Sequence, residues 1–265
     1  MVSINAEIIT SGRELLIGKT VNTNASWIAS QLTSAGVTVV RITTVGDSIG
    51  ELSKAIAESI ARKPSIIIIT GGLGPTYDDL TAEGLASALK LPRDANPDAL
   101  AQVTKKYASM GMQVTPARRK MAIFPEGSLP IRNDIGTAPG IIMDYNGILV
   151  FCLPGVPKEM TAMFSSYIIK VIGACAHTSF AERSFITEGI AESALAPAID
   201  EWRQLHPGIY IKSHPRGAES VPTLEIHLSA TGSDPVALGQ SLKDAEESFT
   251  SFVLKLGGRT RGSVV

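Results

Sequence analysis

Cysteine is scarce in this sequence, and that scarcity limits its chemistry. Cys152 and Cys175 permit at most one disulfide bond, and they exclude a zinc site built from several cysteines. Cys152 stands in the apolar run at residues 148–153, where we expect it to be a small, buried core residue. The chain must therefore depend on an ordinary hydrophobic core, since 44% of its residues are apolar and only 18% are charged.

Net charge and long apolar runs are also lacking. The formal net charge of −1 gives no bulk attraction to nucleic acid or to an anionic membrane. The one basic run, Arg118-Arg119-Lys120, follows Pro116 and is interpreted as a solvated turn. No apolar stretch approaches the length of a membrane span, about 18 residues, and Asn5 and Glu7 interrupt the first apolar run, which argues against a signal peptide. We expect a soluble, cytoplasmic protein with neither nucleic acid nor membrane as a partner.

Strands and helices alternate over residues 1–173. Apolar residues at spacings of three and four predict the helices, and β-branched runs predict the strands. Strands are predicted at residues 2–10, 37–45, 65–70, 121–124, 140–144 and 148–153, and helices at 23–35, 49–62, 80–89, 97–110 and 157–172. This order predicts an α/β domain, a three-layer, mostly parallel sheet with helices on both faces. Ligands of such sheets bind beyond the carboxyl ends of the strands, where the strand order reverses.

The pattern changes after Gly173. Strands are predicted at residues 180–188, 209–213 and 223–230, and helices at 192–205 and 235–254. The resulting β-α-β-β-α order is typical of a small α+β domain. We therefore predict a first domain over residues 1–173, a second over 178–256, and a polar, flexible tail over 257–265.

The most informative stretch is residues 66–81, which read IIIITGGLGPTYDDLT. Four isoleucines in a row predict a strand that is buried on both faces. Gly71, Gly72 and Gly74 follow at once, and without Cβ atoms they let backbone N–H groups approach an anion closely. Asp78 and Asp79 come next, before a predicted helix. Glycines for phosphate and acids for metal or proton transfer predict a phosphorylated ligand here, whereas a plain turn with an acidic helix start is the alternative.

Other turns fall at the same predicted edge of the sheet. Glu14 follows the first strand, and Asp47 ends the second. Residues 136–140, GTAPG, form a rigid turn. Residues 153–159, LPGVPKE, end one strand and open a helix, with Pro157 placed for the first helical position. Together these turns predict a binding site.

Five motifs, taken in order, carry a resemblance to a known family. They lie at residues 12–16, 22–24, 71–81, 136–140 and 153–160. This set resembles the amino-terminal domain of the competence/damage-inducible CinA proteins, in the molybdenum cofactor biosynthesis, or molybdopterin-binding, superfamily. The resemblance implies a metal-dependent pyrophosphatase acting on ADP-ribose, with a fold shared by enzymes that adenylylate molybdopterin. Members are usually dimers or trimers, so it also implies a homodimer, with a trimer as the alternative.

The resemblance also implies roles for individual residues. Asp79 matches the acid of an Asp-x-Thr-x-Glu signature, Asp47 matches the second acid of the site, and Asp78 is the extra acid typical of the CinA branch. Asp78 and Asp79 are the expected ligands of a divalent cation, namely magnesium, manganese or cobalt. Lys19 is a candidate counter-charge for phosphate. The expected ligand-binding residues are Glu14, Asn22, Asn24, Gly71, Gly72, Gly74, Thr76, Gly155 and Lys158.

Two classes of function stay open at this point. The first is an enzyme, either a hydrolase of ADP-ribose or a related nucleotide, or an adenylyltransferase-type protein that acts on molybdopterin. The second is a non-catalytic module that holds a small nucleotide or pterin. The adjacent Asp78 and Asp79 favour hydrolysis, because a protein that only binds polyphosphate gains nothing from two carboxylates facing it.

Overall fold

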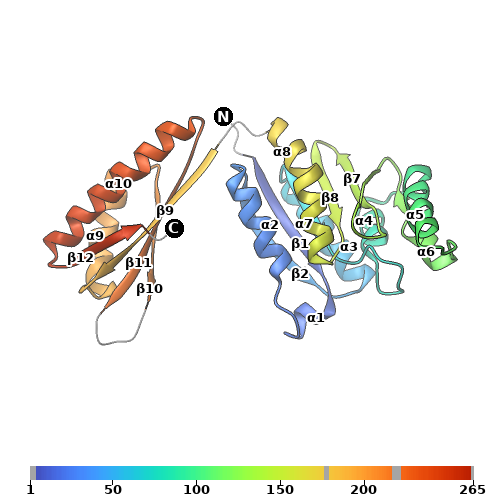
Figure 1. Ribbon diagram of the computed structural model, residues 1–265, viewed down its shortest axis with the longest axis horizontal. Coiled ribbons are helices and arrows are strands. Elements are labelled where there is room, and N and C mark those ends of the chain that lie inside the picture. Colours follow the sequence, from blue (N-terminus) through green and yellow to red (C-terminus); the bar gives the residue numbers. More distant parts are fainter. Residues whose placement is uncertain (1–3, 176–178, 217–221, 264–265) are drawn as a thin grey trace. The chain divides into compact units, whose positions relative to one another are not determined.

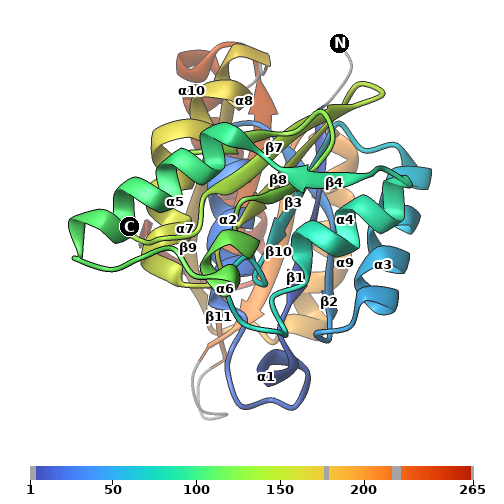
Figure 2. The same cartoon turned by 90° about the vertical axis from the view of Figure 1, so that its right-hand side faces the viewer.

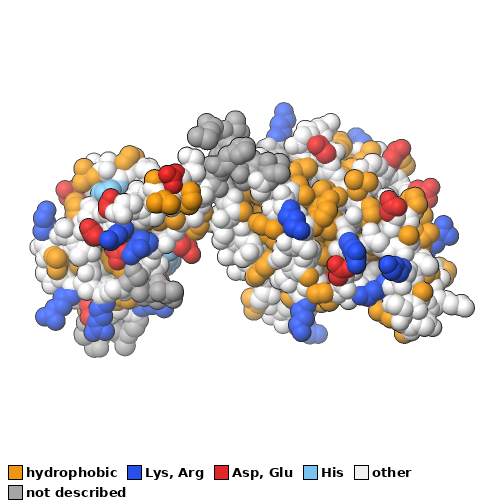
Figure 3. Space-filling view, turned by 45° about the horizontal axis from the view of Figure 1, so that its top comes forward, with side chains coloured by type: hydrophobic (Ala, Val, Ile, Leu, Met, Phe, Trp, Pro, Cys, Tyr) orange, Lys and Arg blue, Asp and Glu red, His pale blue; other side chains and the backbone are white. Residues whose placement is uncertain are grey.

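The computed structural model describes residues 4–175, 179–216 and 222–263, although the side chains of Ala174, Cys175 and Ser263 lie outside the described part. The chain divides into two compact units, Met1–Ala176 and His177–Val265 (Figure 1). Within the described ranges no helix is long and apolar enough to cross a membrane. On the face that Figure 3 shows, acidic and basic side chains are mixed over both units.

A six-stranded sheet forms the centre of the first unit, in the order β2-β1-β3-β8-β7-β6. Its strands span Thr38–Val45 (β2), Asn5–Ser11 (β1), Ile66–Thr70 (β3), Ile148–Leu153 (β8), Gly140–Tyr145 (β7) and Leu129–Ile131 (β6). The first four strands are parallel, and β7 and β6 run antiparallel to their neighbours. The mostly parallel sheet confirms the predicted α/β class. The strand order reverses at β1, which has β2 on one side and β3 on the other.

Helices cover both faces of this sheet, as Figure 2 shows. The helices of the unit are α1 (Arg13–Leu16), α2 (Thr23–Ser34), α3 (Ile49–Arg62), α4 (Thr81–Leu89), α5 (Pro97–Ser109), α6 (Pro116–Lys120), α7 (Pro157–Met163) and α8 (Ile169–Cys175), with a π-helical turn at Phe164–Ile168. α2, α7 and α8 pack on one face, and α3, α4 and α5 pack on the other. In the described part of the chain, the strands of the sheet separate the apolar core on one face from the core on the other.

The four isoleucines of β3 show why this strand lies at the centre. Ile66 and Ile68 face the α2 side, whereas Ile67 and Ile69 face the α3 side, because successive side chains of a strand point to opposite faces. All four are at most 2% exposed, which confirms the strand buried on both faces. Cys152 on β8 is fully buried, as predicted, and burial raises the pKa of its thiol.

One predicted strand of the first unit lies elsewhere than in the main sheet. The segment predicted at residues 121–124 forms β5 (Ile123–Pro125), which pairs with β4 (Arg93–Ala95) in a separate two-stranded sheet. The sequence did not indicate β4, because its three residues, RDA, include two charged side chains and no β-branched or aromatic one. This small sheet joins α4 to α6 beside the loop that follows β3.

The second unit is a four-stranded antiparallel sheet with two helices on one face. Its elements are β9 (Ser179–Glu188), α9 (Glu192–Leu205), β10 (Tyr210–Pro215), β11 (Thr223–Gly232), α10 (Pro235–Lys255) and β12 (Arg259–Ser263). The strand order β10-β11-β9-β12 and the β-α-β-β-α-β succession are those of a ferredoxin-like domain.

The predicted flexible tail is wrong for residues 259–263, which form β12. Thr260 pairs with Thr187 of β9, a strand that would otherwise leave one edge open. Gly257, at a φ of 81°, turns the chain after α10 so that it can return along β9. The polar composition hid this strand, because an edge strand needs few apolar residues.

Candidate functional site

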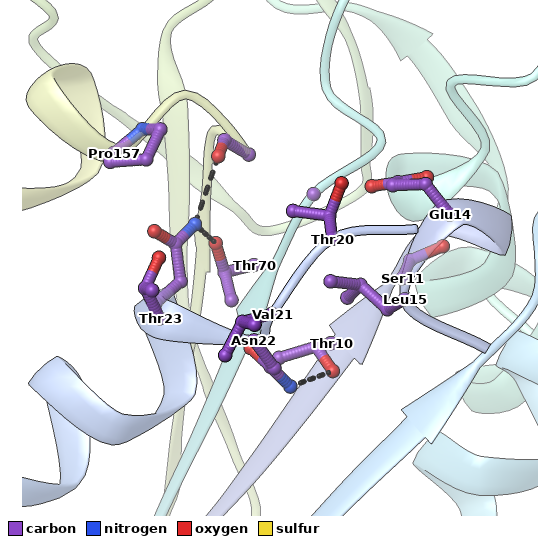
Figure 4. A pocket seen from close by; sticks show the side chains of 13 residues that line it. Thr10, Ser11, Glu14, Leu15, Thr20, Val21, Asn22, Thr23, Thr70 and Pro157 are labelled. Atoms are coloured by element: carbon purple, nitrogen blue, oxygen red, sulfur yellow. Dashed lines mark hydrogen bonds between the residues drawn. The ribbon is translucent and has the colours of Figure 1, made fainter. Parts of the chain in front are cut away.

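A pocket opens at the carboxyl ends of β1, β3 and β8 (Figure 4). It encloses about 120 Å³, and it lies where the strand order reverses. Its lining is mostly neutral and polar: Thr10, Ser11, Glu14, Leu15, Thr20, Val21, Asn22, Thr23, Asn24, Thr70, Gly71, Gly155 and Pro157. Five predicted site residues, Glu14, Asn22, Asn24, Gly71 and Gly155, are thus brought together here.

Gly71 is required by packing rather than by access for an anion. A Cβ on Gly71 would lie 2.2 Å from the carbonyl oxygen of Ser11, and its φ of 106° is one that other residues rarely adopt. Its N–H donates to the carbonyl of Leu153 at 3.0 Å, so this N–H is already used. Gly155 also lies close, although less so, since a Cβ there would lie 3.3 Å from the Cα of Gly71. Because Gly71 and Gly155 have no side chains, the carboxyl ends of β1, β3 and β8 can lie close together.

The two asparagines of the pocket are used differently. Asn22 caps α2: its Oδ1 accepts the N–H of Ala25 at 3.1 Å, and its Nδ2 donates to Thr10 at 2.9 Å. Asn24 donates from Nδ2 to Gly155 and Thr70, but its buried Oδ1 accepts no hydrogen bond from the residues described. Buried polar atoms without partners are rare, which makes this oxygen a candidate for ligand contact.

Asp47 lies beside the pocket without lining it. Its carboxylate accepts hydrogen bonds from Ser11 Oγ at 3.2 Å and from the N–H of Arg13 at 2.9 Å. It thereby fixes the end of β1 and the start of α1, where a carboxylate is favourable. The structure therefore gives Asp47 a positioning role for the Glu14 segment.

The loop between β3 and α4 carries the other predicted residues. Asp79 Oδ2 accepts hydrogen bonds from Thr76 N–H at 2.8 Å and from Thr76 Oγ1 at 2.7 Å. Asp78 Oδ1 also accepts from Thr76 Oγ1. A Cβ on Gly74 would lie 2.5 Å from Asp79, so glycine is needed for the carboxylate to fold over the loop. Both carboxylates thus meet at one hydroxyl group.

Three successive backbone N–H groups of this loop have no acceptor among the residues described. Gly72, Leu73 and Gly74 donate no backbone hydrogen bond to any residue in the described ranges. The carbonyls of Gly71 and Gly72 are held instead, by the hydroxyl and the N–H of Thr81 at 2.7 and 3.0 Å. Anchored on one side and open on the other, successive N–H groups of this kind suit phosphate oxygens.

Lys120 is a residue of this region that the sequence analysis missed. Its ammonium group donates to the carbonyl of Thr76, and it lines a small pocket together with Gly72, Gly74 and Asp79. The interpretation of residues 118–120 as a solvated turn is therefore wrong. They form the end of α6, where Arg118 also packs over the ring of Tyr107 at 4.2 Å. Thr115 before Pro116 was the available signal, since it caps a helix.

The hydrogen bond from Thr76 holds the pKa of Asp78 below its usual range, and the Asp78 backbone N–H and the charge of Lys120 act in the same direction. Asp78 therefore stays ionised at neutral pH. The two lysines predicted as counter-charges are placed less favourably: Lys19 and Lys158 are exposed and do not line the pocket.

Glu159 of α7 and Asn133 fix the turn at residues 136–140 through hydrogen bonds. Asn133 donates to Glu159 Oε2 at 2.7 Å and accepts the N–H of Gly136 at 2.8 Å. A Cβ on Gly136 would collide with Glu159, so this glycine allows the carboxylate to reach the loop. The turn is thus held by side-chain hydrogen bonds, and it does not contribute to the pocket lining.

The carboxylates can be tested for their fit to a divalent cation. Asp78 and Asp79 meet at the hydroxyl of Thr76, so one cation is within reach of both. No group of three or more His, Cys, Asp or Glu residues suited to a metal occurs among the residues described. Two carboxylates fit magnesium best when substrate phosphates complete its coordination, because magnesium usually binds in this way.

The fold and the site together define an α/β protein with a ligand site at the switch point of its sheet. A family model described as a probable molybdopterin binding domain matches residues 7–174, which is nearly the whole of the first unit. The chain belongs to this family.

Similar proteins extend the match. A protein of Sulfurisphaera tokodaii is 44% identical over 254 residues, 96% of each chain, and one of Metallosphaera sedula is 43% identical over the same share. The crystal structure of the protein CinA, of unknown function, from Thermoplasma acidophilum is 43% identical, with a TM-score of 0.60. It covers 64% of this chain and 98% of that chain. The resemblance to CinA stated from the motifs is thereby confirmed.

Proposed function

We propose that this chain is a metal-dependent hydrolase that cleaves the pyrophosphate bond of ADP-ribose or a related nucleotide. The observation that carries the proposal is the loop after β3, in which Asp78 and Asp79 meet at the hydroxyl of Thr76. Three open N–H groups lie in the same loop. Phosphate-binding donors beside two acids are what pyrophosphate cleavage requires, since the departing phosphate gains charge as the bond breaks.

Each residue has a distinct part in this proposal. The N–H groups of Gly72, Leu73 and Gly74 donate to phosphate oxygens. Asp78 and Asp79 hold the cation, magnesium, manganese or cobalt, which when bound neutralises charge on the pyrophosphate. Asp47 keeps the Glu14 segment in position through Arg13 and Ser11.

The reaction needs a water molecule and a group to take its proton. A water oxygen bonds to one phosphorus while the bridging P–O bond breaks, and ADP-ribose then yields AMP and ribose 5-phosphate. Asp79 Oδ1 accepts no hydrogen bond from the described residues, so it can take the proton of that water. The small pocket that Asp79 lines encloses about 20 Å³, the room of about one water molecule.

The test is an assay of the full chain with ADP-ribose in the presence of magnesium, manganese or cobalt. AMP and ribose 5-phosphate should form in equal amounts, and chelation of the metal should stop their formation. No AMP with any of the three metals, or full activity in the chelator, would contradict the proposal.

Binding of a pterin without cleavage is the second candidate, and the family match supports it. The neutral, polar pocket with the open Asn24 Oδ1 is the feature that favours it, because pterin rings carry N–H donors. Titration with molybdopterin separates the candidates: binding without adenylylation or hydrolysis of any nucleotide would replace the enzyme by a binding module.

A further inference from the structure

Lys120 reaches the loop after β3 from a distant part of the chain. It ends α6, a helix that Thr115 caps and Pro116 opens, 44 residues from Thr76. Its side chain is half-buried, and its ammonium group donates to the Thr76 carbonyl. Ordering a long lysine side chain costs conformational entropy, so this placement needs a compensating interaction.

In the described part of the chain no carboxylate contacts the ammonium group of Lys120, although its charge acts on Asp78 from a greater distance. The other cation that lines the same pocket, Arg93, is paired with Glu83 at 3.1 Å. Lys120 has no carboxylate within 4.0 Å in the ranges that the structure describes. Its present acceptor is a neutral carbonyl, which is a weaker partner for an ammonium group than an anionic oxygen is.

We propose, building on the nucleotide site proposed above, that Lys120 is a phosphate-binding residue of that site. Its ammonium group donates to a phosphate oxygen of the ligand, on the same pocket wall as Gly72 and Gly74, and the Thr76 carbonyl takes the place of that oxygen when no ligand is bound. Lys120 thus supplies the cation that the exposed Lys19 and Lys158 do not bring to the loop.

A purely structural role is the competing explanation, in which Lys120 only holds the loop through Thr76. The two roles differ in what they affect. A phosphate contact acts on ligands that carry phosphate and not on the nucleoside alone. A structural role acts on every ligand that needs the loop, whatever its charge.

The experiment measures dissociation constants by titration calorimetry with the full chain, with the divalent metals chelated so that no cleavage occurs. The probes are ADP-ribose, inorganic pyrophosphate and adenosine. The variants are Lys120→Met, Lys120→Arg and, as the control, Arg119→Gln, which removes a neighbouring exposed charge of the same helix.

Lys120→Met should weaken the binding of ADP-ribose and pyrophosphate by about 10- to 100-fold, the size expected for one charge-assisted hydrogen bond. Adenosine binding should stay unchanged, Lys120→Arg should recover most of the loss, and Arg119→Gln should bind all three probes as the parent does. Parent-like binding of both phosphate probes by Lys120→Met would overturn the proposal. An equal loss for adenosine would overturn it too, in favour of the structural role.

This design separates the two proposals. A parent that binds ADP-ribose in a Lys120-dependent way but never cleaves it would refute the hydrolase and leave the role of Lys120 standing. If the parent cleaves ADP-ribose and Lys120→Met binds it as tightly as the parent does, the hydrolase proposal stands and the role of Lys120 is refuted. A parent that binds neither ADP-ribose nor pyrophosphate in the chelator, and that does not cleave ADP-ribose when metal is present, would refute both.

Discussion

The two ends of the central sheet contain similar polar residues but use them differently. At the amino-terminal end, Glu7 is only 3% exposed, and Arg62 donates to both of its oxygens at 2.7 Å. Asn5 accepts the N–H of Ser65 nearby at 2.8 Å. At the carboxyl end, Asn24 Oδ1 is buried without a partner in the described part of the chain. Three backbone N–H groups lie open there as well.

The difference separates stability from binding within one sheet. A paired buried charge holds the strands in register, and removing its partner is costly. An unpaired buried polar group lowers stability, and such groups are rare. Ser59 Oγ, beside Glu7, is one in the described part of the chain, but Asn24 Oδ1 lines a pocket. The carboxyl end therefore carries the features of a site.

Asp79→Asn, at the carboxyl end of the sheet, should have the largest effect on the proposed activity. Asparagine can still accept the N–H of Thr76, so the loop should keep its shape while losing the negative charge. We expect the rate of ADP-ribose cleavage to fall by about 10²- to 10⁴-fold, the range for a general acid–base group. Turnover at saturating substrate is the measurement, and Asp98→Asn on α5 is the control. Cleavage at the parent rate by Asp79→Asn would remove Asp79 from the mechanism.

Glu7→Gln tests the amino-terminal end. It leaves the Arg62 charge without its counter-charge, and we expect the first unit to lose about 2–4 kcal/mol, somewhat less than for a fully buried pair, because Arg62 is 36% exposed. Hydrogen exchange of β1 amides measures this loss in the first unit alone. Glu126→Gln, at an exposed position, should change nothing. Cleavage activity should persist at temperatures where the variant stays folded, since Glu7 lies far along β1 from the site.

The same ion pair predicts a dependence of stability on pH. Burial raises the pKa of Glu7, but the hydrogen bonds and charge of Arg62 outweigh it, so the pKa lies below its ordinary value of 4.5. The stabilisation is therefore fully present above pH 4.5 and is lost as the pH falls through the lowered pKa of the folded state. Unfolding measured across this range should show a smaller slope for Glu7→Gln than for the parent. Identical slopes would mean that other carboxylates account for the acid sensitivity.

Much of the fold around the two ends of the sheet could be predicted from the sequence, because short sequence patterns determine where its strands and helices form. The unbroken run Ile66 to Ile69 predicted a strand buried on both faces, as the structure has it. Helices α3 and α9 begin and end at the predicted residues. Gly71 and Gly155 were expected at one sheet edge, since parallel strands end together. These inferences needed only strand and helix patterns and the rule for switch points, whereas Asn24 was expected from the family resemblance.

What escaped prediction depends on contacts between distant segments. Lys120 meets Thr76 across 44 residues, and nothing in the run at 118–120 indicates which of its cations turns towards the loop. Asp47 was expected as the second acid of the site, but its hydrogen bonds with Ser11 and with the N–H of Arg13 join distant segments and could not be predicted. β12 forms because β9 has an open edge, a property of the folded sheet rather than of the tail.

Removal of β12 tests that corrected segment. A chain that stops after Gly258 exposes the edge of β9, and we expect the second unit to lose about 1–3 kcal/mol and to self-associate. Arg261→Gln is the matched control, because it removes only an exposed ion pair with Glu188 and should cost at most about 0.5 kcal/mol. Hydrogen exchange of β9 reports both changes. Unchanged protection of β9 in the shortened chain would mean that β12 adds no stability.

The two asparagines of the pocket give the finest version of the comparison. Asn22 and Asn24 each make internal hydrogen bonds, so Asn22→Ala and Asn24→Ala should both lower stability by about 1 kcal/mol. Only Asn24 has an acceptor to spare, and its loss should also weaken ADP-ribose binding by about 3- to 10-fold, as for one neutral hydrogen bond. Calorimetric titration of both variants decides this. If both variants bind ADP-ribose with the same affinity, Asn24 Oδ1 contacts solvent rather than the ligand. The loop after β3 would then be the remaining evidence that the carboxyl end of the sheet is a binding site.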